Sequence, residues 1–376
     1  MTSEDRILHE VCSLPTAPFH EHRVVEYARR FVAQRPKLRL NQDSHGNVLI
    51  ELPGRRRSLP RWIFGAHMDH PGFVARSMAG DGVVEADFRG HVAAEYVKSC
   101  GVVFYDGSRE IRGKVVAVTP DKDVPRAAMV RAEVQADVPA DALGMFDLGE
   151  GRIEDGIFYC RAIDDVGGCA AALAMTDQLW KDPPLSGVGV LLTRAEEEGF
   201  IGAIAASIRP TLLRKSDRIV AIETSAAQSY APLGAGPIIR VGDRTSTFDS
   251  ALNYFLTQQA VALRQSSRGF EFQRALMPGG TCEATVYDVY GFHASSICVA
   301  LGNYHNMDRQ KGRLGPEYIS ADDWRNMVKL FVAIARNGHE YEEGHKLLRG
   351  KIEARFRKMR PLLANMRQTR RRHAGS

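Results

Sequence analysis

Short apolar segments of strand length alternate with helical patterns in two separate parts of this chain. In the first part, a helical pattern over residues 20–33 precedes apolar runs at 47–52 and 62–66. The second part has four apolar runs, at residues 188–193, 218–222, 237–241 and 296–301, with a helical pattern between the first two and another between the last two. Strands that alternate with helices form parallel sheets covered on both faces, so the pattern predicts an α/β fold with a doubly wound, mostly parallel sheet.

The segment between these two parts has a different pattern. Residues 72–159 show little helical periodicity, carry β-branched runs such as 115–118 and 129–134, and contain three Asp-Gly turn signals. A chain of 376 residues is long enough for two domains. We therefore expect a discontinuous α/β domain from residues 1–72 and 160–340, and an inserted all-β domain from residues 73–159.

The charge of the chain is concentrated at its C-terminal end. The net charge is +5, but residues 341–376 hold 11 Lys/Arg against 3 Asp/Glu, and the preceding residues hold 39 basic and 42 acidic side chains. We expect residues 341–376 to form a basic helical tail. Its simplest interpretation is a solvated helix, and contact with nucleic acid, anionic lipid or an acidic protein is the alternative.

Several classes of protein are excluded by what the sequence lacks. No apolar run approaches the ~18 residues of a membrane-spanning helix, and the N-terminus has no signal-peptide pattern, so we expect a cytoplasmic protein without a membrane partner. None of the six cysteines forms a Cys-x-x-Cys pair, which favours buried thiols over disulfides or a zinc-cysteine site. Nucleophile-elbow and phosphate-loop motifs are also absent.

A set of acidic and histidine residues follows the ends of the predicted strands or precedes a predicted helix. Taken singly, each has an ordinary explanation as a helix cap, a surface acid or a loop histidine. The set comprises His67 and Asp69, the pair Asp164-Asp165, the run Glu196-Glu197-Glu198, Glu223, and His305.

Their shared position is what suggests chemistry. Doubly wound sheets bind their ligands at the carboxyl ends of the strands. Three adjacent glutamates at a strand end repel one another unless a cation neutralises them. Two imidazoles and three carboxylates can fill two metal positions if one carboxylate bridges, and a further glutamate then remains as general base.

The order His-x-Asp, Asp-Asp, Glu-Glu-x-Gly, acid, His resembles that of the co-catalytic dizinc exopeptidases. The 97 positions from His67 to Asp164 contain the β-rich segment, as in the tetrahedral-assembly and glutamyl aminopeptidases of metallopeptidase family 42. The run 193–203 is similar to the family's Thr-x-x-Glu-Glu-x-Gly-x-x-Gly-Ala motif, and 279–281 to the start of its Gly-Gly-Thr-Asp-Ala segment. This chain departs from the second motif with Cys282-Glu283, and it has Glu223 where Asp is common.

The resemblance implies a metal-dependent aminopeptidase with two divalent metal ions, for which zinc is favoured and cobalt and manganese are alternatives. It implies that Glu196 is the general base and that Asp69 orients His67. The implied ligands are His67, Asp164 and Glu223 for one metal and Asp164, Glu197 and His305 for the other, with Asp164 bridging.

The resemblance also implies short peptide substrates and a homo-oligomer, either a dimer or a dodecamer. Two alternatives remain open at this point. One is another dizinc amidohydrolase, such as a deacylase or a carboxypeptidase. The other is a non-catalytic binding protein on the same fold that uses its basic tail to hold nucleic acid or a partner.

Overall fold

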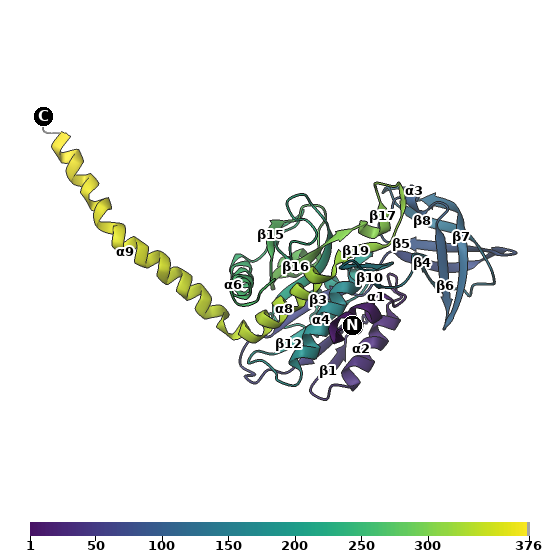
Figure 1. The fold of residues 1–376 in the computed structure, drawn as a ribbon, viewed down its shortest axis with the longest axis horizontal. Coiled ribbons are helices and arrows are strands. Elements are labelled where there is room, and N and C mark those ends of the chain that lie inside the picture. The colour runs from purple at the N-terminus through teal and green to yellow at the C-terminus, as the bar shows by residue number, and fades with distance from the viewer. Residues whose placement is uncertain (374–376) are drawn as a thin grey trace.

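The computed structural model describes residues 1–373, with the side chains of residue 345 and of residues 364–373 left aside. An eleven-stranded mixed sheet forms the centre of the molecule (Figure 1). Nine of its strands follow the order β1 (Arg39–Gln42), β2 (Val48–Leu52), β12 (Val188–Thr193), β3 (Trp62–His67), β13 (Arg218–Ala226), β16 (His293–Gly302), β19 (Glu317–Ser320), β11 (Ile157–Cys160) and β10 (Arg152–Glu154). Off this path, β14 (Ile238–Gly242) pairs with β16 and with β15 (Gln273–Leu276).

The prediction of a mostly parallel sheet holds only for the centre of this sheet. Strands β12, β3, β13 and β16 are parallel to one another, whereas the pairs β1–β2, β2–β12, β16–β19, β11–β19 and β10–β11 are antiparallel. Parallel neighbours need a long crossover, which the helices provide at the centre. The edge strands β1–β2 and β10–β11 are joined by short turns, and such connections produce antiparallel pairs.

Helices cover both faces of the sheet, as the alternating pattern predicts. One apolar core joins the sheet to five helices: α1 (Ser3–Cys12), α2 (His22–Ala33), α4 (Val166–Leu179), α6 (Ser250–Ser266) and α8 (Ala321–Asn337). A second core joins the opposite face to α5 (Ile201–Ile208) and α7 (Glu283–Val289). The predicted cap of α8 is present, since the Ser320 hydroxyl accepts a hydrogen bond from the Asp323 N–H at 3.2 Å.

The small residues at the start of α4 explain how this helix reaches the site. Almost every residue of α4 is buried between the sheet, α1 and α8, and Gly167 and Gly168 lie in its first turn. The Gly167 carbonyl accepts a hydrogen bond from the Trp324 indole of α8 at 2.9 Å. This close packing fixes the N-terminal end of α4, and with it Asp164 just before the helix, against the sheet.

A six-stranded closed barrel lies beside the sheet, on the right in Figure 1. Its strands occur in the order β4 (Gly72–Gly80), β5 (Val83–Arg89), β8 (Ala127–Val134), β7 (Arg109–Pro120), β6 (Gly101–Asp106) and β9 (Leu143–Phe146). The barrel has an apolar core of its own, in which the Phe73 ring lies 5.1 Å from Phe88 and 5.2 Å from Phe146. A short helix, α3 (Ala94–Val97), connects β5 to β6.

The structure sets the edge of this barrel earlier than the expected boundary at residue 159. Strands β10 and β11, which lie inside the β-rich segment of the sequence, pair with β19 of the large sheet instead. Two short strands, β17 (Met307–Asp308) and β18 (Arg313–Leu314), extend from the sheet toward α3 of the barrel. Strand propensity alone does not tell which of two sheets a strand joins, because pairing depends on tertiary contacts.

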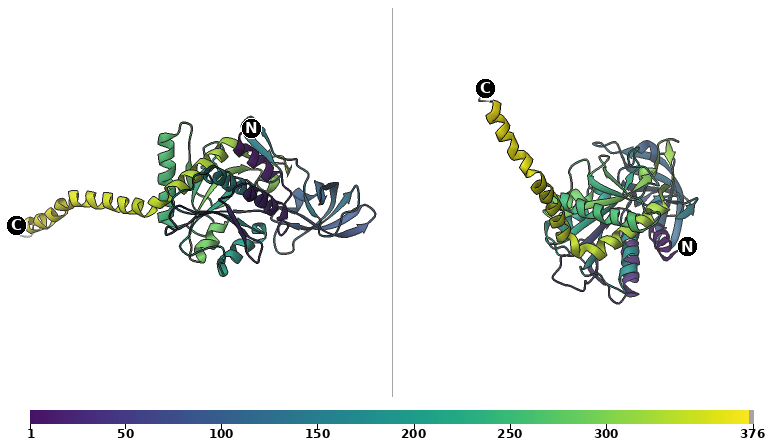
Figure 2. Two further views of the ribbon diagram at one scale, coloured as in Figure 1. Left: turned by 90° about the horizontal axis from the view of Figure 1, so that it is seen from below. Right: turned by 60° about the vertical axis from the view of Figure 1, so that its left-hand side comes forward.

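The C-terminal helix α9 (Tyr341–His373) projects away from the rest of the molecule (Figures 1 and 2). Its first turn is anchored, since the Tyr341 ring lies 6.1 Å from Trp62 and Glu342 forms a 2.7 Å ion pair with Arg218. Between residues 347 and 363, most of its apolar side chains are exposed, among them Ile352 and Phe356. The expected tail of residues 341–376 thus starts with this helix, and residues 374–376 lie outside the described part.

Two further expectations concern cysteines and membranes. All six cysteines are free thiols and all except Cys100 are buried, which confirms the prediction from their spacing. Within residues 1–373, none of the helices combines the length and the apolarity that crossing a bilayer requires.

Candidate metal-binding active site

The four parallel strands end at one edge of the sheet, and this edge gathers the predicted residues. His67 is the last residue of β3, and Glu223 lies in β13. Glu196 and Glu197 form a 3-10 turn after β12, and His305 lies in a second 3-10 turn after β16. The structure therefore brings side chains separated by up to 238 positions of sequence to one place, as expected for the carboxyl ends of parallel strands.

Two groups of three ligand atoms share the carboxylate of Asp164. His67, Asp164 and Glu223 form one group, and Asp164, Glu197 and His305 form the other; within each group the ligand atoms lie within 4.8 Å of one another. Asp164 Oδ1 lies 3.6 Å from His67 Nε2, and Asp164 Oδ2 lies 3.7 Å from His305 Nε2. One carboxylate thus presents an oxygen to each group.

The donor atoms of both groups fit divalent cations. Asp164 Oδ1, Glu197 Oε1 and Glu223 Oε1 are buried and have no hydrogen-bond partner, although His305 Nε2 lies 3.2 Å from Glu197 Oε1. Buried carboxylate oxygens are costly without a partner, and a metal ion supplies one. Imidazole nitrogens with carboxylate oxygens are donors that suit zinc and its neighbours in the first transition row.

Glu196 occupies a different position from the ligand residues. Its Oε2 lies 3.9 Å from His67 Nε2, and its side chain retains 13% of its exposure, whereas the side chains of Glu197 and His67 are almost fully buried. Burial raises the pKa of Glu196 well above its usual range; His67 opposes this shift, and the Glu223 and Glu197 carboxylates add to it. Glu196 is therefore the acid in the cluster that lies beside the ligands and still faces solvent.

Asp69 holds the Glu196 turn in place. Its Oδ1 accepts the Glu196 N–H at 3.0 Å, and its Oδ2 accepts the Glu197 N–H at 3.1 Å. Asp69 is expected to orient His67, and the nearer contact is to its backbone. His67 Nδ1 lies 3.1 Å from the Asp69 carbonyl oxygen and 3.6 Å from the Asp69 carboxylate. One residue thus contacts both a candidate ligand and the candidate base.

The turn before Glu196 carries backbone strain that other contacts offset. Ala195 has φ of 50°, a left-handed conformation that costs a non-glycine residue about 1–3 kcal/mol. The Ala195 N–H donates to Glu21 Oε1 at 3.0 Å, and Glu21 also pairs with Arg194 at 2.7 Å. Sequence reasoning missed Glu21, because nothing in its helix-flanking context indicates a contact 174 positions away.

Glu317 is a second supporting residue that the sequence analysis missed. Its Oε2 accepts the Asp164 N–H at 3.1 Å and the Ile163 N–H at 2.7 Å, and its Oε1 accepts the His305 N–H at 2.9 Å. It therefore fixes the backbone of two candidate ligands at once. In the sequence, Glu317 is a lone glutamate in a short strand-like segment, residues 317–320. That pattern by itself is weak evidence for a role in the site.

His70 is the third. Its Nδ1 lies 2.7 Å from the Asp164 carbonyl oxygen and its Nε2 lies 3.0 Å from Asn306 Oδ1. A second histidine three positions after His67 is a local sequence signal for this role. In addition, His305 Nδ1 lies 2.9 Å from the His91 carbonyl oxygen, so a loop of the barrel orients a candidate ligand.

Two acids near the cluster fall outside both ligand groups. Asp165, the neighbour of Asp164, is buried, makes no cap hydrogen bond to α4 and has a pKa that burial raises well above its usual range. Glu283 belongs to α7, where its Oε2 accepts the Tyr287 hydroxyl at 3.1 Å. Burial raises the pKa of Glu283 to about 6. The unusual Cys282-Glu283 pair thus lies beside the cluster, with Cys282 buried at the start of α7.

A cavity of about 230 Å³ adjoins the cluster and is lined by two arginines that form no ion pair. Glu223 lines it together with Arg240, Arg309 and Thr281. Arg240 is 3% exposed; its Nη1 lies 3.4 Å from the Ser225 hydroxyl, and its Nε has no hydrogen-bond partner. No carboxylate of the described residues lies within ion-pair distance of Arg240 or Arg309. A buried guanidinium that forms no direct ion pair, next to a candidate metal ligand, is suited to a carboxylate on a bound molecule.

Comparison with known proteins identifies relatives of this fold. A family model described as M42 glutamyl aminopeptidase matches residues 46–314. A search of curated proteins found no match.

Among solved structures, the aminopeptidase APDkam598 from the archaeon Desulfurococcus kamchatkensis is similar, with 20% identity and a TM-score of 0.74 over 89% of this chain and 94% of that one. The TET1 peptidase of Pyrococcus horikoshii, described as able to assemble into a tetrahedron or a large octahedral shell, has 20% identity and a TM-score of 0.72 over 89% and 99%. An M18-family aminopeptidase from Thermotoga maritima has 12% identity and a TM-score of 0.65 over 88% and 95%.

Proposed function

The chain belongs to the M42 glutamyl aminopeptidase family, and from this premise we propose that it is a metal-dependent aminopeptidase that removes N-terminal residues from short peptides. The observation that carries the proposal is the carboxylate of Asp164, which presents one oxygen to each of two ligand groups. The orphaned oxygens of Glu197 and Glu223 support it, because they provide one further ligand to each group.

The proposed roles follow from this geometry. His67, Asp164 and Glu223 would hold one cation, and Asp164, Glu197 and His305 would hold the other. Two divalent cations, for which we favour zinc over cobalt or manganese, would polarise the scissile carbonyl and lower the pKa of the attacking water. Asp69, Glu317 and His70 hold the backbone of the ligand residues, as supporting partners do in metal sites.

Glu196 is the proton carrier in this proposal. Its carboxylate accepts a proton from the attacking water and returns it to the nitrogen of the leaving amine, so that the peptide bond breaks without release of an amide anion. Asp69 positions it through the N–H of Glu196.

The first test separates an aminopeptidase from the other dizinc amidohydrolases. A pool of short peptides, free and N-acetylated, is incubated with zinc- or cobalt-loaded protein, and the products are identified by mass spectrometry. We expect stepwise loss of N-terminal residues from the free peptides alone, since an aminopeptidase requires the free amine. Deacetylation or trimming from the C-terminus would instead indicate a deacylase or a carboxypeptidase, and no cleavage would favour a binding protein.

We further propose that the preferred N-terminal residue has an acidic side chain. The cavity beside Glu223 offers the guanidinium groups of Arg240 and Arg309, and neither has a carboxylate partner among the described residues. A glutamate or aspartate side chain that enters this cavity would form the direct ion pair that these guanidinium groups lack. The family description, glutamyl aminopeptidase, agrees with this choice.

Replacement of these arginines tests the preference. In Arg309→Gln, we expect kcat/KM for a peptide with N-terminal glutamate to fall about tenfold or more, because a charge-assisted hydrogen bond is lost. The same variant should cleave a peptide with N-terminal alanine at the wild-type rate, which serves as the control for folding and metal content. Equal losses on both substrates, or none on glutamate, would contradict the assignment. Arg240→Met, measured on the same pair, tests the buried group.

The domain organisation and the assembly complete the proposal. We propose that the barrel is a domain inserted into a catalytic α/β domain, because it closes on itself and has a separate apolar core. The barrel also contributes the His91 carbonyl that contacts His305, so insertion at this point couples it to the site. Since the TET1 peptidase is described as assembling into shells, we propose a homo-oligomer, either a dimer or a dodecamer.

A further inference from the structure

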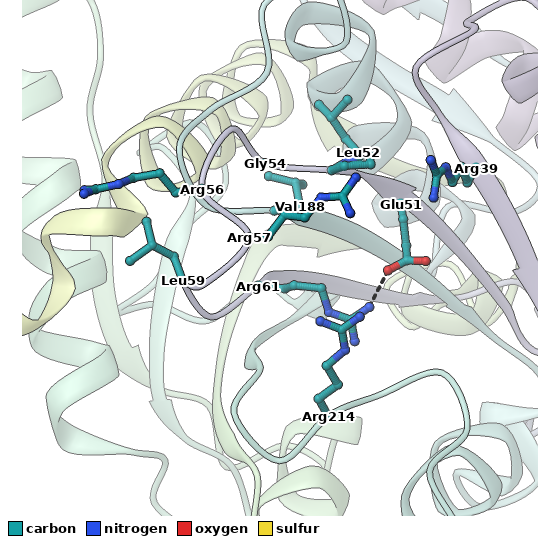
Figure 3. Close-up of a pocket in the computed structure, with 12 residues that line it drawn as sticks. Arg39, Glu51, Leu52, Gly54, Arg56, Arg57, Leu59, Arg61, Val188 and Arg214 are labelled. Carbon is teal, nitrogen blue, oxygen red and sulfur yellow. Dashed lines mark hydrogen bonds and ion pairs between the residues drawn. The ribbon is translucent and has the colours of Figure 1, made fainter.

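A second cavity, of about 200 Å³, lies at the opposite edge of the sheet from the metal cluster (Figure 3). It is bounded by the loop after β2, the start of β12 and the loop before β13. Arg61, which lines it, directly precedes β3, and His67 ends the same strand. A strand of six residues spans about 20 Å, so this cavity is well separated from the residues proposed to act on the peptide.

Positive charge dominates the lining of this cavity. Five arginines contribute to it, against the single carboxylate of Glu51. The arginines are Arg39, Arg56, Arg57, Arg61 and Arg214. Figure 3 shows three of them, Arg39, Arg57 and Arg214, arranged around the pair formed by Arg61 and Glu51.

Only one of these arginines is neutralised by the protein. Arg61 is 8% exposed, donates from its Nη2 to Asp217 Oδ2 at 2.6 Å and forms a second ion pair with Glu51. Within residues 1–373, the other four guanidinium groups have no ion pair and no hydrogen-bond acceptor. Glu51 already pairs with Arg61, so its charge does not neutralise the other four arginines. The cavity therefore keeps an excess of positive charge.

Hydrogen bonds anchor the backbone around the cavity. Asp217 Oδ2 accepts the Arg214 N–H at 2.8 Å in addition to the Arg61 side chain, which fixes where the Arg214 side chain starts. The Arg56 N–H donates to the Leu185 carbonyl at 2.9 Å, and the Arg55 N–H donates to the Pro184 carbonyl at 3.0 Å. These two hydrogen bonds connect the loop after β2 to the loop before β12. Because these hydrogen bonds already hold the loop backbone in place, an anion does not have to order it on binding.

We propose that this cavity binds a small phosphate-bearing anion, such as a polyphosphate or the phosphates of a nucleotide. Phosphate oxygens match the planar donor fork of arginine, and several guanidinium groups around one concavity favour a multiply charged anion. The volume is more than tenfold the roughly 10–15 Å³ that one water needs, which is room for a compact anion. The inference does not depend on the proposed peptidase activity.

The test measures binding of inorganic triphosphate and of ATP by calorimetry, at constant ionic strength set with chloride. We expect saturable binding of one anion per chain. In the double variant Arg57→Gln/Arg214→Gln, both affinities should fall about tenfold or more, because two charge-assisted contacts are lost. Both side chains are exposed and unpaired, so the melting temperature without ligand should remain that of the wild type.

Arg55→Gln is the matched control. Arg55 lies in the same loop, does not line the cavity, and has its guanidinium 4.0 Å from Asp182. Its replacement removes one positive charge, half of what the double variant removes, and should leave the affinity within about twofold. Tighter binding of ATP than of inorganic triphosphate would identify a nucleotide as the ligand, whereas equal binding would identify the phosphates alone.

Three results would overturn the proposal. The first is no saturable binding to the wild type. The second is an equal loss of affinity in Arg55→Gln and in the double variant, which would indicate general surface charge. The third is unchanged binding in the double variant, which would place the anion elsewhere, for example on cations in the metal cluster.

Discussion

Glu196→Gln is expected to lower kcat by about 10²–10⁴-fold, the usual contribution of a general acid–base, while the protein keeps its metal ions. Glutamine has the size of glutamate and can retain contacts around the turn, but it cannot accept and return a proton at neutral pH. Glu196 belongs to neither ligand group, so metal content should not change. Steady-state kinetics on a free peptide, with metal analysis by mass spectrometry of the same sample, gives both quantities.

Glu198→Gln provides the matched control for this experiment. Glu198 lies in the same 3-10 turn, but its carboxylate faces the barrel, where it accepts the Gly90 N–H at 2.8 Å and pairs with Arg126 at 3.3 Å. The amide oxygen of glutamine can still accept the Gly90 N–H, so activity should remain near that of the wild type. Near-full activity of Glu196→Gln, or a comparable loss in Glu198→Gln, would refute the assignment of Glu196 as the base.

Removal of the metal ions is the second change with a large expected effect. Chelation should abolish peptide cleavage, and addition of zinc, cobalt or manganese should restore it, because both ligand groups then regain a cation. The metal that restores the highest kcat/KM at equal occupancy identifies the preferred ion. Activity that persists after complete chelation would contradict the proposed site.

The metal-free protein should also become less stable as the pH rises. Burial raises the pKa of Glu223 to about 8. Burial alone would lower the pKa of His305, but the Glu197 and Asp164 carboxylates outweigh it and raise this pKa to about 9. Each group binds its proton more tightly in the folded than in the unfolded chain, so its stabilising effect is complete below its ordinary pKa and is lost as the pH rises through 8 and 9.

Thermal unfolding at several pH values tests whether the stability of the metal-free protein falls as the pH rises. Between pH 6 and pH 9, we expect the melting temperature of the chelated protein to fall by roughly 5 °C or more. The zinc-loaded protein is the control, because bound cations replace protons as partners of these groups and should flatten the dependence. A melting temperature of the chelated protein that rises over this range would show that the buried acids are not protonated in the folded state.

Much of the site was visible in the sequence because of how parallel sheets are built. Consecutive βα units place the carboxyl end of every parallel strand at one edge, so the segments that end with His67, Glu197 and Glu223 had to converge. The apolar runs of strand length indicate where these carboxyl ends lie in the sequence. The same reasoning predicted the Ser320 cap and the apolar face of α8, since both are local features of a helix.

The supporting residues could not be predicted in this way. Glu21, Glu317 and the His91 carbonyl reach the site from a helix flank, an edge strand and a barrel loop. Each acts through hydrogen bonds to backbone groups that are far away in sequence, and such contacts leave no periodicity or spacing to read. The strands β10 and β11 lie in the β-rich segment of the sequence but pair with the large sheet, and strand character does not specify a pairing partner.

The sequence by itself determined the alternating α/β architecture and the residues that meet at the ends of the central strands, because both follow from local periodicity and the direction of parallel strands. Only the tertiary structure decided which oxygen of Asp164 faces which histidine, where the barrel ends, and that arginines from three separate segments surround one cavity at the opposite edge. These features depend on contacts between distant segments. Their geometry is fixed by packing and by the satisfaction of buried polar groups, which act only once the chain has folded.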